Sequence, residues 1–208
     1  MSNGAGPGAQ PASAKTSAAV ADLAQRMRGE DVPLGAIVAH LKDRGFGIFM
    51  ILFALPNAVI PGISFILGAP VLLFALQLAA GRGEVWLPGF LRRRTLPAAL
   101  FEKIAERTEK FLIWAEKRVR PRWVWLVSGR AERFLALYIA IAAAFLMMPV
   151  PFGNALPALG ISFISAGLIE KDGKATAVGI ALSFLGALYI GAAFILGLGA
   201  IAALLARF

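Results

Sequence analysis

The sequence contains no cysteine and only one histidine, His40. Without cysteine the chain forms neither disulfides nor thiolate metal sites. A single histidine with no nearby pair of carboxylates argues against a histidine-based metal site and against a Ser-His-Asp triad. A nucleotide loop of the form Gly-x-x-x-x-Gly-Lys-Ser/Thr is absent, and so are paired carboxylates within an apolar segment. We therefore predict no catalytic residue, no metal, no cofactor and no enzymatic activity.

Charged residues are also scarce. Only 16% of the 208 residues are charged, whereas 59% are hydrophobic. Soluble domains carry about a quarter charged residues, so this composition predicts an all-α integral membrane protein. The net charge of +9 fits basic loops on the cytoplasmic side that contact anionic lipid, and it does not require nucleic acid as a partner.

The N-terminal segment lacks large apolar residues after Met1. Residues 1–16 are rich in Gly, Ala, Pro and Ser and are predicted to be a disordered tail. The basic start and apolar stretch of a signal peptide are missing, so the N-terminus is expected to stay in the cytoplasm. Two short amphipathic helices, over residues 17–29 and 33–45, are predicted to follow.

The sequence is rich in apolar runs, which are interrupted by proline, glycine and asparagine. Each half of the chain has an amphipathic helix, an apolar run, a break and a second apolar run. The tripeptide Ile-Ser-Phe follows the break in both halves, at 63–65 and 161–163. We predict two structural repeats, each a broken helical hairpin, whose orientation, tandem or inverted, stays open. The runs are 46–55 and 63–80 around the break 56–62, and 134–148 and 158–169 around the break 149–157.

Five segments result from this pattern. After the tail come a first repeat over 17–80, a basic region over 81–130, a second broken hairpin over 131–173, and a C-terminal membrane segment over 174–208, as one helix or two. Within the basic region, residues 97–119 form an amphipathic helix expected to lie in the lipid interface. All four tryptophans of the chain lie between residues 86 and 125, and such rings prefer the interface.

The breaks themselves indicate function. Non-helical backbone is tolerated at membrane depth only inside protein or beside a wet cavity, and paired broken segments point to a binding site. We interpret the two breaks as re-entrant hairpin tips that pack together. Asn57 and Asn154 would bring polar groups there, and the N-termini of the helices that follow would favour an anion. The alternative is a plain tight turn in which each asparagine caps the next helix.

Other side chains join these as candidates. The ligand or ion candidates are Asn57, Pro61, Gly62, Ser64, Gln77, Asn154 and Glu170. Gln77 could instead join two helices, and Glu170 and Asp172 could simply be solvated. Lipid head-group candidates are Arg82, Arg92, Arg93 and Arg94. Small residues recur every four positions at Gly179, Ser183, Ala187 and Gly191, which predicts close helix packing within the chain or in a homodimer.

Three stretches carry a family resemblance. They are "DRGFG", "FALPNAVIPGISFILGAPVLLFALQLAAGRGEVWLPGFLRRRTL" and "MMPVPFGNALPALGISFISAGLIEKDG". The chain resembles the ExoD family of bacterial membrane proteins over roughly residues 33–173. Gly-Glu-Val between Arg82 and Trp86 departs from the more basic or proline-bearing link expected there. The resemblance implies a multi-pass protein of the bacterial inner membrane with a role in exopolysaccharide production and in growth under alkaline stress. It brings no assigned catalytic residue.

Two function classes follow, besides the enzyme that ranks last. The chain could transport or flip an anionic lipid-linked intermediate or a small ion, which the paired breaks and basic residues favour. It could instead be a scaffold or regulator of polysaccharide machinery that transports nothing. The sequence names neither a substrate nor an oligomeric state.

Overall fold

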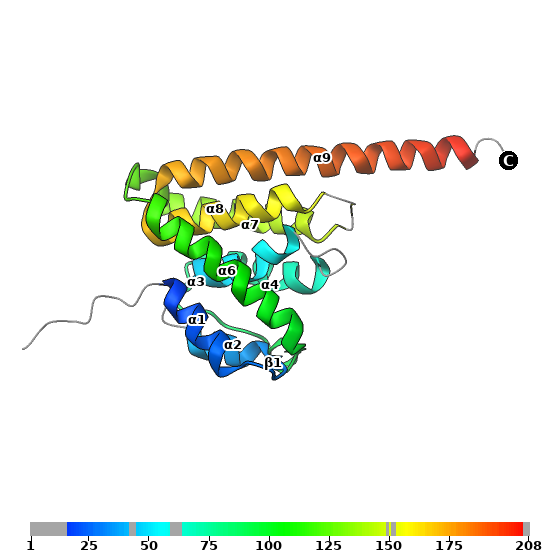
Figure 1. Cartoon of the computed structure of the whole chain (residues 1–208). Coiled ribbons are helices and arrows are strands. Elements are labelled where there is room, and N and C mark those ends of the chain that lie inside the picture. Colours follow the sequence, from blue (N-terminus) through cyan, green and yellow to red (C-terminus); the bar gives the residue numbers. More distant parts are fainter. Residues whose placement is uncertain (1–15, 42–44, 59–63, 149, 151–152, 206–208) are drawn as a thin grey trace, which may run out of the picture.

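The computed structural model describes residues 16–41, 45–58, 64–148, 150 and 153–205, with side chains as far as residue 197. The predicted disordered tail lies outside these residues except for Thr16, where α1 begins. The described chain is all-α apart from two very short strands (Figure 1). The helices are α1 Thr16–Arg26, α2 Leu34–Leu41, α3 Phe46–Ala54, η2 Leu55–Ala58, α4 Ser64–Ala79, α5 Gly89–Arg92, α6 Ala98–Arg118, η3 Val124–Val127, α7 Arg130–Leu146, α8 Ala155–Glu170 and α9 Gly173–Leu205.

The four helices of the two hairpins form an antiparallel bundle. Helix α3 lies beside α8, and α4 lies beside α7. A Cβ added to Gly47, near the start of α3, would lie 2.6 Å from Cγ1 of Ile169 near the end of α8. A Cβ added to Gly68, early in α4, would lie 2.7 Å from Cγ of Met147, which follows α7. Both breaks therefore lie at the same end of the bundle, and the outer ends of the hairpins lie at the other.

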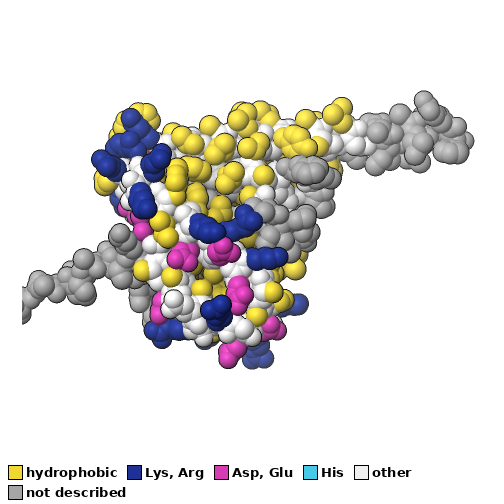
Figure 2. Space-filling model, viewed as in Figure 1, with side chains coloured by type: hydrophobic (Ala, Val, Ile, Leu, Met, Phe, Trp, Pro, Cys, Tyr) yellow, Lys and Arg dark blue, Asp and Glu magenta, His cyan; other side chains and the backbone are white. Residues whose placement is uncertain are grey.

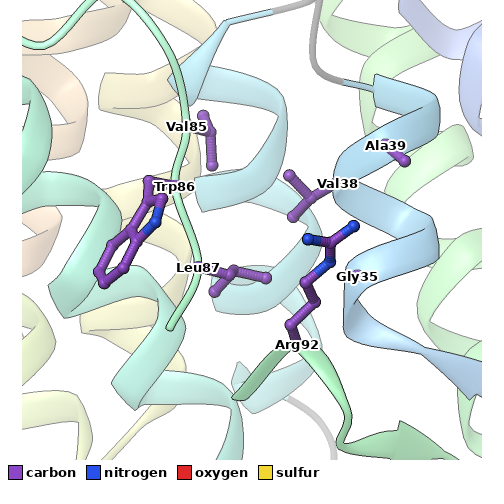
Figure 3. A pocket seen from close by; sticks show the side chains of 7 residues that line it. All are labelled: Gly35, Val38, Ala39, Val85, Trp86, Leu87 and Arg92. Carbon is purple, nitrogen blue, oxygen red and sulfur yellow. The ribbon is translucent and has the colours of Figure 1, made fainter. Parts of the chain in front are cut away.

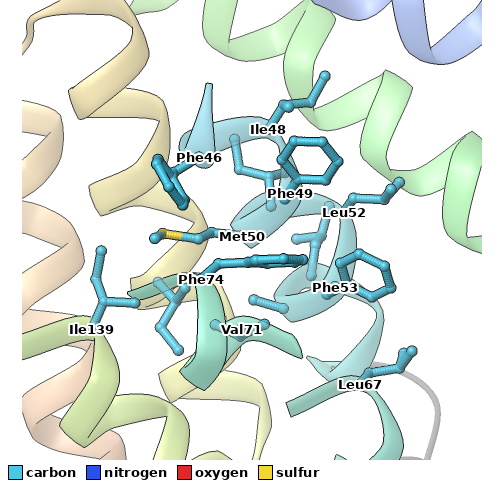
Figure 4. Packing of buried hydrophobic residues seen from close by; sticks show 14 of the residues in the cluster. Phe46, Ile48, Phe49, Met50, Leu52, Phe53, Leu67, Val71, Phe74 and Ile139 are labelled. Carbon is cyan, nitrogen blue, oxygen red and sulfur yellow. The ribbon is translucent and has the colours of Figure 1, made fainter. Parts of the chain in front are cut away.

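Helix α3 is the centre of the core. All nine of its residues are buried, because α4, α8, α6 and η2 surround it. Figure 4 shows how its aromatic and aliphatic side chains pack on Phe74 and Val71 of α4 and on Ile139 of α7. The rings of Phe49 and Phe53 lie 5.4 and 6.0 Å from that of Phe74. A helix that is apolar on every side is stable only where protein or lipid encloses it completely.

Helix α6 corrects one expectation. Its apolar stripe is buried against the protein, chiefly against α1, η2 and α3, and does not face lipid. The buried residues of the stripe are Phe101, Ile104, Ala105, Thr108, Leu112 and Ala115. The charged face of α6 stays exposed, and Figure 2 shows Lys, Arg, Asp and Glu side chains over it. The amphipathic pattern predicted the helix correctly but did not reveal its apolar partner.

A small two-stranded clip joins the first helices to the start of α6. Strand β1, Val32–Pro33, pairs antiparallel with β2, Thr95–Leu96. The backbone N–H of Leu34 also donates to the carbonyl of Arg94 at 2.9 Å. The clip fixes α2 beside α5 and thereby places the three arginines of residues 92–94.

Helix α9 is one continuous helix of 33 residues, about 50 Å long at 1.5 Å per residue. Its first half packs on α8, and its second half extends past the bundle (Figure 1). Within the described chain, one segment is long and apolar enough to cross a membrane: Gly173–Gly197, with a mean hydropathy of 2.1 and 22% of its most apolar window buried.

The matching Ile-Ser-Phe tripeptides are not structurally equivalent. Ser64 is the first residue of α4, whereas Ser162 lies in the middle of α8 and donates to the carbonyl of Ala158 at 2.8 Å. The repeat of sequence elements thus stays a prediction. The shared order of elements supports it, and the tripeptide does not.

Candidate functional site

The two hairpins touch at their tips through one polar contact. Asn154, the residue before α8, donates from Nδ2 to Oγ of Ser64 at 2.5 Å. Ser64 begins α4, and the two residues are 90 positions apart in the chain. The start of α8 and the start of α4 therefore meet. We call Asn57, Ser64 and Asn154 the hairpin tips.

Asn57 adds a second amide to the same end of the bundle. It lies in η2, is 4% exposed and donates from Nδ2 to the carbonyl of Phe53 at 2.7 Å. The side-chain oxygens of Asn57 and Asn154 are buried, and neither has a hydrogen-bond partner in the described part of the chain. A buried acceptor without a partner costs about 1–3 kcal/mol, and such groups usually serve a purpose. The hairpin tips thus present two oxygens that a hydrogen-bond donor or a cation could satisfy.

The capping alternative for Asn154 is wrong. Asn154 occupies the N-cap position of α8, but its side chain makes no capping hydrogen bond and reaches across to the other hairpin. Pro61 and Gly62, which were grouped with these candidates, lie outside the described residues.

Gln77 is fully occupied. Its Nε2 donates to the carbonyl of Trp86, and the N–H of Trp86 donates to its Oε1, each at 2.8 Å. These two hydrogen bonds fix the segment after α4 against that helix, because the side-chain amide pairs with the backbone of Trp86 as the backbone of a neighbouring strand would. This contact neither joins two helices nor leaves an amide group for a ligand.

The four candidate arginines lie on the surface and do not converge. The guanidinium of Arg82 lies over the ring of Trp86 at 5.8 Å. Arg92 lines a cavity of about 180 Å³ between α2 and residues 85–87 (Figure 3). Its side chain crosses Gly35 so closely that an added Cβ there would lie 2.5 Å from Cγ of Arg92. Arg93 and Arg94 are exposed, and neither forms an ion pair within the described chain.

Glu170, at the end of α8, is a partly buried carboxylate. Burial raises its pKa, and repulsion from Glu116 adds to that rise. Glu116 accepts hydrogen bonds from the backbone N–H and the hydroxyl of Ser17, each at 2.8 Å. It thereby fixes the start of α1, where a negative charge is favourable. Glu170 lies at the outer end of its hairpin and not with the hairpin tips.

Asp172 is the residue that sequence reasoning missed. Its side chain is 0% exposed, so the expectation that it is solvated is wrong. Its Oδ2 accepts from Nη2 of Arg122 at 2.7 Å and from the N–H of Arg120 at 3.0 Å. Its Oδ1 accepts from the N–H of Lys174 at 2.8 Å, at the start of α9. Burial alone would raise the pKa of Asp172, but these hydrogen bonds outweigh it and lower the pKa. The signal available in the sequence was an aspartate directly before an apolar helix, which is the position of an N-cap.

The ridge of small residues packs mainly within the chain. A Cβ added to Gly179 would lie 2.5 Å from the carbonyl oxygen of Gly160 in α8, and Ser183 lies against the same glycine. Ser183 donates to the carbonyl of Gly179 at 2.9 Å. Gly191 has open space around it. Gly179 and Ser183 therefore pack α9 on α8, and a homodimer through this ridge stays a prediction.

The described residues hold no cluster of three or more His, Asp or Glu side chains that could bind a metal ion. The polar groups of the bundle are instead amides, hydroxyls and one buried carboxylate. His40 is half-buried, and its Nε2 lies 3.1 Å from Oδ2 of Asp22.

These features define an all-helical protein built from two broken apolar hairpins, a covering amphipathic helix and a long apolar C-terminal helix. Residues 16–192 match the family model described as "Exopolysaccharide synthesis, ExoD". The chain belongs to this ExoD family.

Two curated relatives agree with that assignment. The chain is 33% identical over 162 residues to uncharacterized protein slr1875 of Synechocystis sp. (strain ATCC 27184 / PCC 6803 / Kazusa), covering 76% of each chain. It is 29% identical over 160 residues to Protein ExoD of Rhizobium meliloti (strain 1021), covering 74% of this chain and 66% of that one. No solved structure matches.

Proposed function

We propose that this chain is a multi-pass inner-membrane protein with a cytoplasmic N-terminus that supports exopolysaccharide production. Family membership supports the role in exopolysaccharide synthesis. The membrane location is supported by the large apolar side chains left exposed on three neighbouring helices of the bundle, since soluble surfaces rarely carry so many. These are Phe65, Ile66 and Leu76 of α4, Phe134, Leu137 and Ile141 of α7, and Phe184, Leu188 and Ile195 of α9.

Within that role, we propose that the hairpin tips bind and pass a small ion. The observation that carries the proposal is that the buried amide oxygens of Asn57 and Asn154 have no hydrogen-bond partner among the described residues, beside the contact between Asn154 and Ser64. In so apolar a bundle, a buried oxygen without a hydrogen-bond partner lowers the stability of the fold unless a ligand binds to it. Two broken helices that meet at one end supply such a place.

The chemistry of these groups favours a cation over an anion. Both amide N–H₂ groups already donate to protein acceptors, so the free groups are carbonyl-type oxygens, the ligands that hard cations prefer. No basic side chain belongs to the hairpin tips, whereas an anionic lipid-linked intermediate would need one. The transported species we propose is therefore a small cation, and not the anion that the helix N-termini alone would favour.

Ion flux into liposomes tests this proposal. The purified full chain would be reconstituted into vesicles loaded with a sodium or potassium indicator, and a gradient of either ion would be imposed. We expect Asn57→Leu and Asn154→Leu each to lower the flux by about tenfold, the equivalent of about 1.4 kcal/mol of lost binding, while folded protein remains.

Thr108→Val is the matched control, because Thr108 is also fully buried, its hydroxyl has no hydrogen-bond partner among the described residues, and it belongs to α6 and not to the hairpin tips. It should leave the flux within about twofold of the parent chain, a change below about 0.4 kcal/mol. Flux no greater than in empty vesicles, or equal loss in the control, would overturn the transport proposal.

A scaffold without transport is the second candidate. The close contact of α8 with α9 at Gly160 and Gly179 and the direct contact between the tips favour it, since tightly packed helices leave no passage. Zero flux together with normal polysaccharide output from the Asn57→Leu and Asn154→Leu variants in cells would support this candidate.

A further inference from the structure

A cluster of basic and aromatic side chains lies at the end of the bundle opposite the hairpin tips. We call it the basic platform. It comes from the end of α6 and the segment after it, from η3, and from the turn between α8 and α9 with the first turn of α9, and all of its members are exposed. They are Arg118, Arg120, Arg122, Trp123, Val124, Trp125, Lys171 and Lys174. Figure 2 shows Lys and Arg side chains gathered with hydrophobic ones where α9 begins.

The large apolar side chains of the platform are highly exposed to solvent. Trp125 is 73% exposed, Trp123 51% and Val124 44%. The ammonium group of Lys174 lies 5.4 Å from the ring of Trp123. Tryptophans with an open ring beside cations are typical of the boundary between a bilayer core and its head groups.

The backbone under the platform is held rigidly. Asp172 joins Arg120 and Arg122 to the start of α9, as described above, and the N–H of Gly173 donates to the carbonyl of Arg122 at 2.6 Å. A Cβ added to Gly173 would lie 2.6 Å from the carbonyl oxygen of Trp123, so only glycine allows this approach. Trp123 and Lys171 both adopt left-handed backbone, with φ of 49° and 55°. Non-glycine residues rarely adopt that conformation, and it marks segments whose shape serves a function.

The charge of the platform is almost entirely positive. The acidic side chains beside it in the chain are Asp172, which is buried and paired with Arg122, Glu170 at the end of α8, and Glu116, which accepts hydrogen bonds from Ser17. Glu132, in the first turn of α7, is half-buried. Five cations therefore face solvent around two open tryptophans, at the point where the apolar helices α7 and α9 begin and α8 ends.

We propose that the basic platform binds the head groups of anionic phospholipids and sets the depth of the bundle in the membrane. Arginine and lysine supply the attraction to phosphate, and the tryptophans enter the interface. The inference rests only on the membrane location within the proposed function and not on ion transport. It assigns lipid contact to residues 118–125 and 171–174 and not to the arginines of residues 92–94.

Energy transfer to labelled lipids tests the platform directly. In the full chain carrying Trp86→Phe and Trp114→Phe, Trp123 and Trp125 are the remaining tryptophans. This chain would be reconstituted in phosphatidylcholine vesicles with traces of dansyl-phosphatidylglycerol or dansyl-phosphatidylcholine. We expect transfer to the anionic lipid to exceed transfer to the zwitterionic one by about threefold, because basic side chains at the membrane surface attract anionic lipids.

The variant Arg118→Gln/Arg120→Gln/Lys171→Gln removes three charges without touching the Asp172 contacts made by side chains. It should abolish the preference, and the matched variant Arg92→Gln/Arg93→Gln/Arg94→Gln should retain it. Equal transfer to the two lipids in the parent chain, or equal loss in both triple variants, would overturn the proposal. Loss of the preference on adding inorganic phosphate, but not chloride at the same ionic strength, would show a free-phosphate site instead. Because no ion flux is measured, this result stands apart from the transport test.

Discussion

The two ends of the helical bundle are built in opposite ways. At the hairpin tips, a hydrogen bond between Asn154 and Ser64 joins the two hairpins, and two amide oxygens have no partner in the part of the chain that the structure describes. At the platform end, the single carboxylate of Asp172 accepts hydrogen bonds from four residues and ties three segments together. Both ends carry buried polar groups, but the Asp172 carboxylate has its hydrogen-bond donors, whereas the two amide oxygens of the tips have none among the described residues.

This difference indicates how the bundle divides its tasks. A fully satisfied polar network fixes one geometry, whereas a partly satisfied one leaves free energy that a ligand can recover. We therefore expect the platform end to keep a single geometry. The hairpin tips are the end where binding could change the structure.

The largest effect should come from breaking the satisfied end. Asp172→Ala leaves the guanidinium of Arg122 and two helical N–H groups without their acceptor. We expect it to lower the free energy of unfolding by about 3 kcal/mol, because several hydrogen bonds to one buried carboxylate are lost and a hydrogen bond to a charged group contributes about 1.5–3 kcal/mol. Thermal unfolding of the detergent-solubilised chain, followed by tryptophan fluorescence, measures the change.

Asp172→Asn provides a folded comparison if the alanine variant does not accumulate, because it keeps the size of the side chain and loses the charge. Glu106→Ala is the exposed control: it removes the Glu106–Lys110 pair on the open face of α6, and exposed pairs contribute little. An Asp172→Ala variant as stable as the control would show that the two ends do not differ.

Acid should weaken the platform end selectively. The pKa of Asp172 is lowered in the folded chain, so its carboxylate contributes its full stabilisation above the ordinary value of 3.8 and loses it as the pH falls through the lower, folded value. The stability difference between the parent chain and Asp172→Asn should therefore be constant above about pH 5 and shrink below about pH 4. Measuring the free energy of unfolding of both proteins across that pH range tests this prediction. A stability difference that grows on acidification would refute the stabilising role of the Asp172 carboxylate.

The smallest effect should come from the hairpin tips. Asn154→Ala removes one cross-hairpin hydrogen bond but also removes a buried oxygen that has no partner among the described residues. We expect a change in the free energy of unfolding of about 1 kcal/mol or less. Loss comparable to Asp172→Ala would mean that the hairpin tips are as strongly held as the other end, and the comparison would fail.

Much of the helical layout could be predicted from the sequence. The apolar runs, their proline and glycine breaks, and the amphipathic pattern of residues 97–119 correspond to α3, α4, α7, α8 and α6. These features are local, because periodicity and helix breakers act within a few turns. The polar residues of the tips were found for the same reason.

The contacts between distant segments could not be predicted. Asp172 looked solvated because nothing local shows that Arg120 and Arg122, some 50 residues earlier, fold back onto it. The apolar stripe of α6 looked ready for lipid because its partners in α1 and α3 lie far away in the chain. Gln77 was expected to contact a ligand or a second helix, since its actual partner is the backbone of Trp86, which leaves no side-chain pattern in the sequence.

The complete burial of α3 has a consequence for how the chain is made. This helix leaves the ribosome early, yet the surfaces that enclose it are completed by α6 and α8, which are synthesised later. Until then the sides of α3 that α6 and α8 cover have no protein neighbour, and at nine residues, about 14 Å, the helix is too short to span a bilayer alone. We therefore expect the first hairpin to complete its packing only after the second has been synthesised, and a chain stopped after α4 to leave those sides of α3 uncovered.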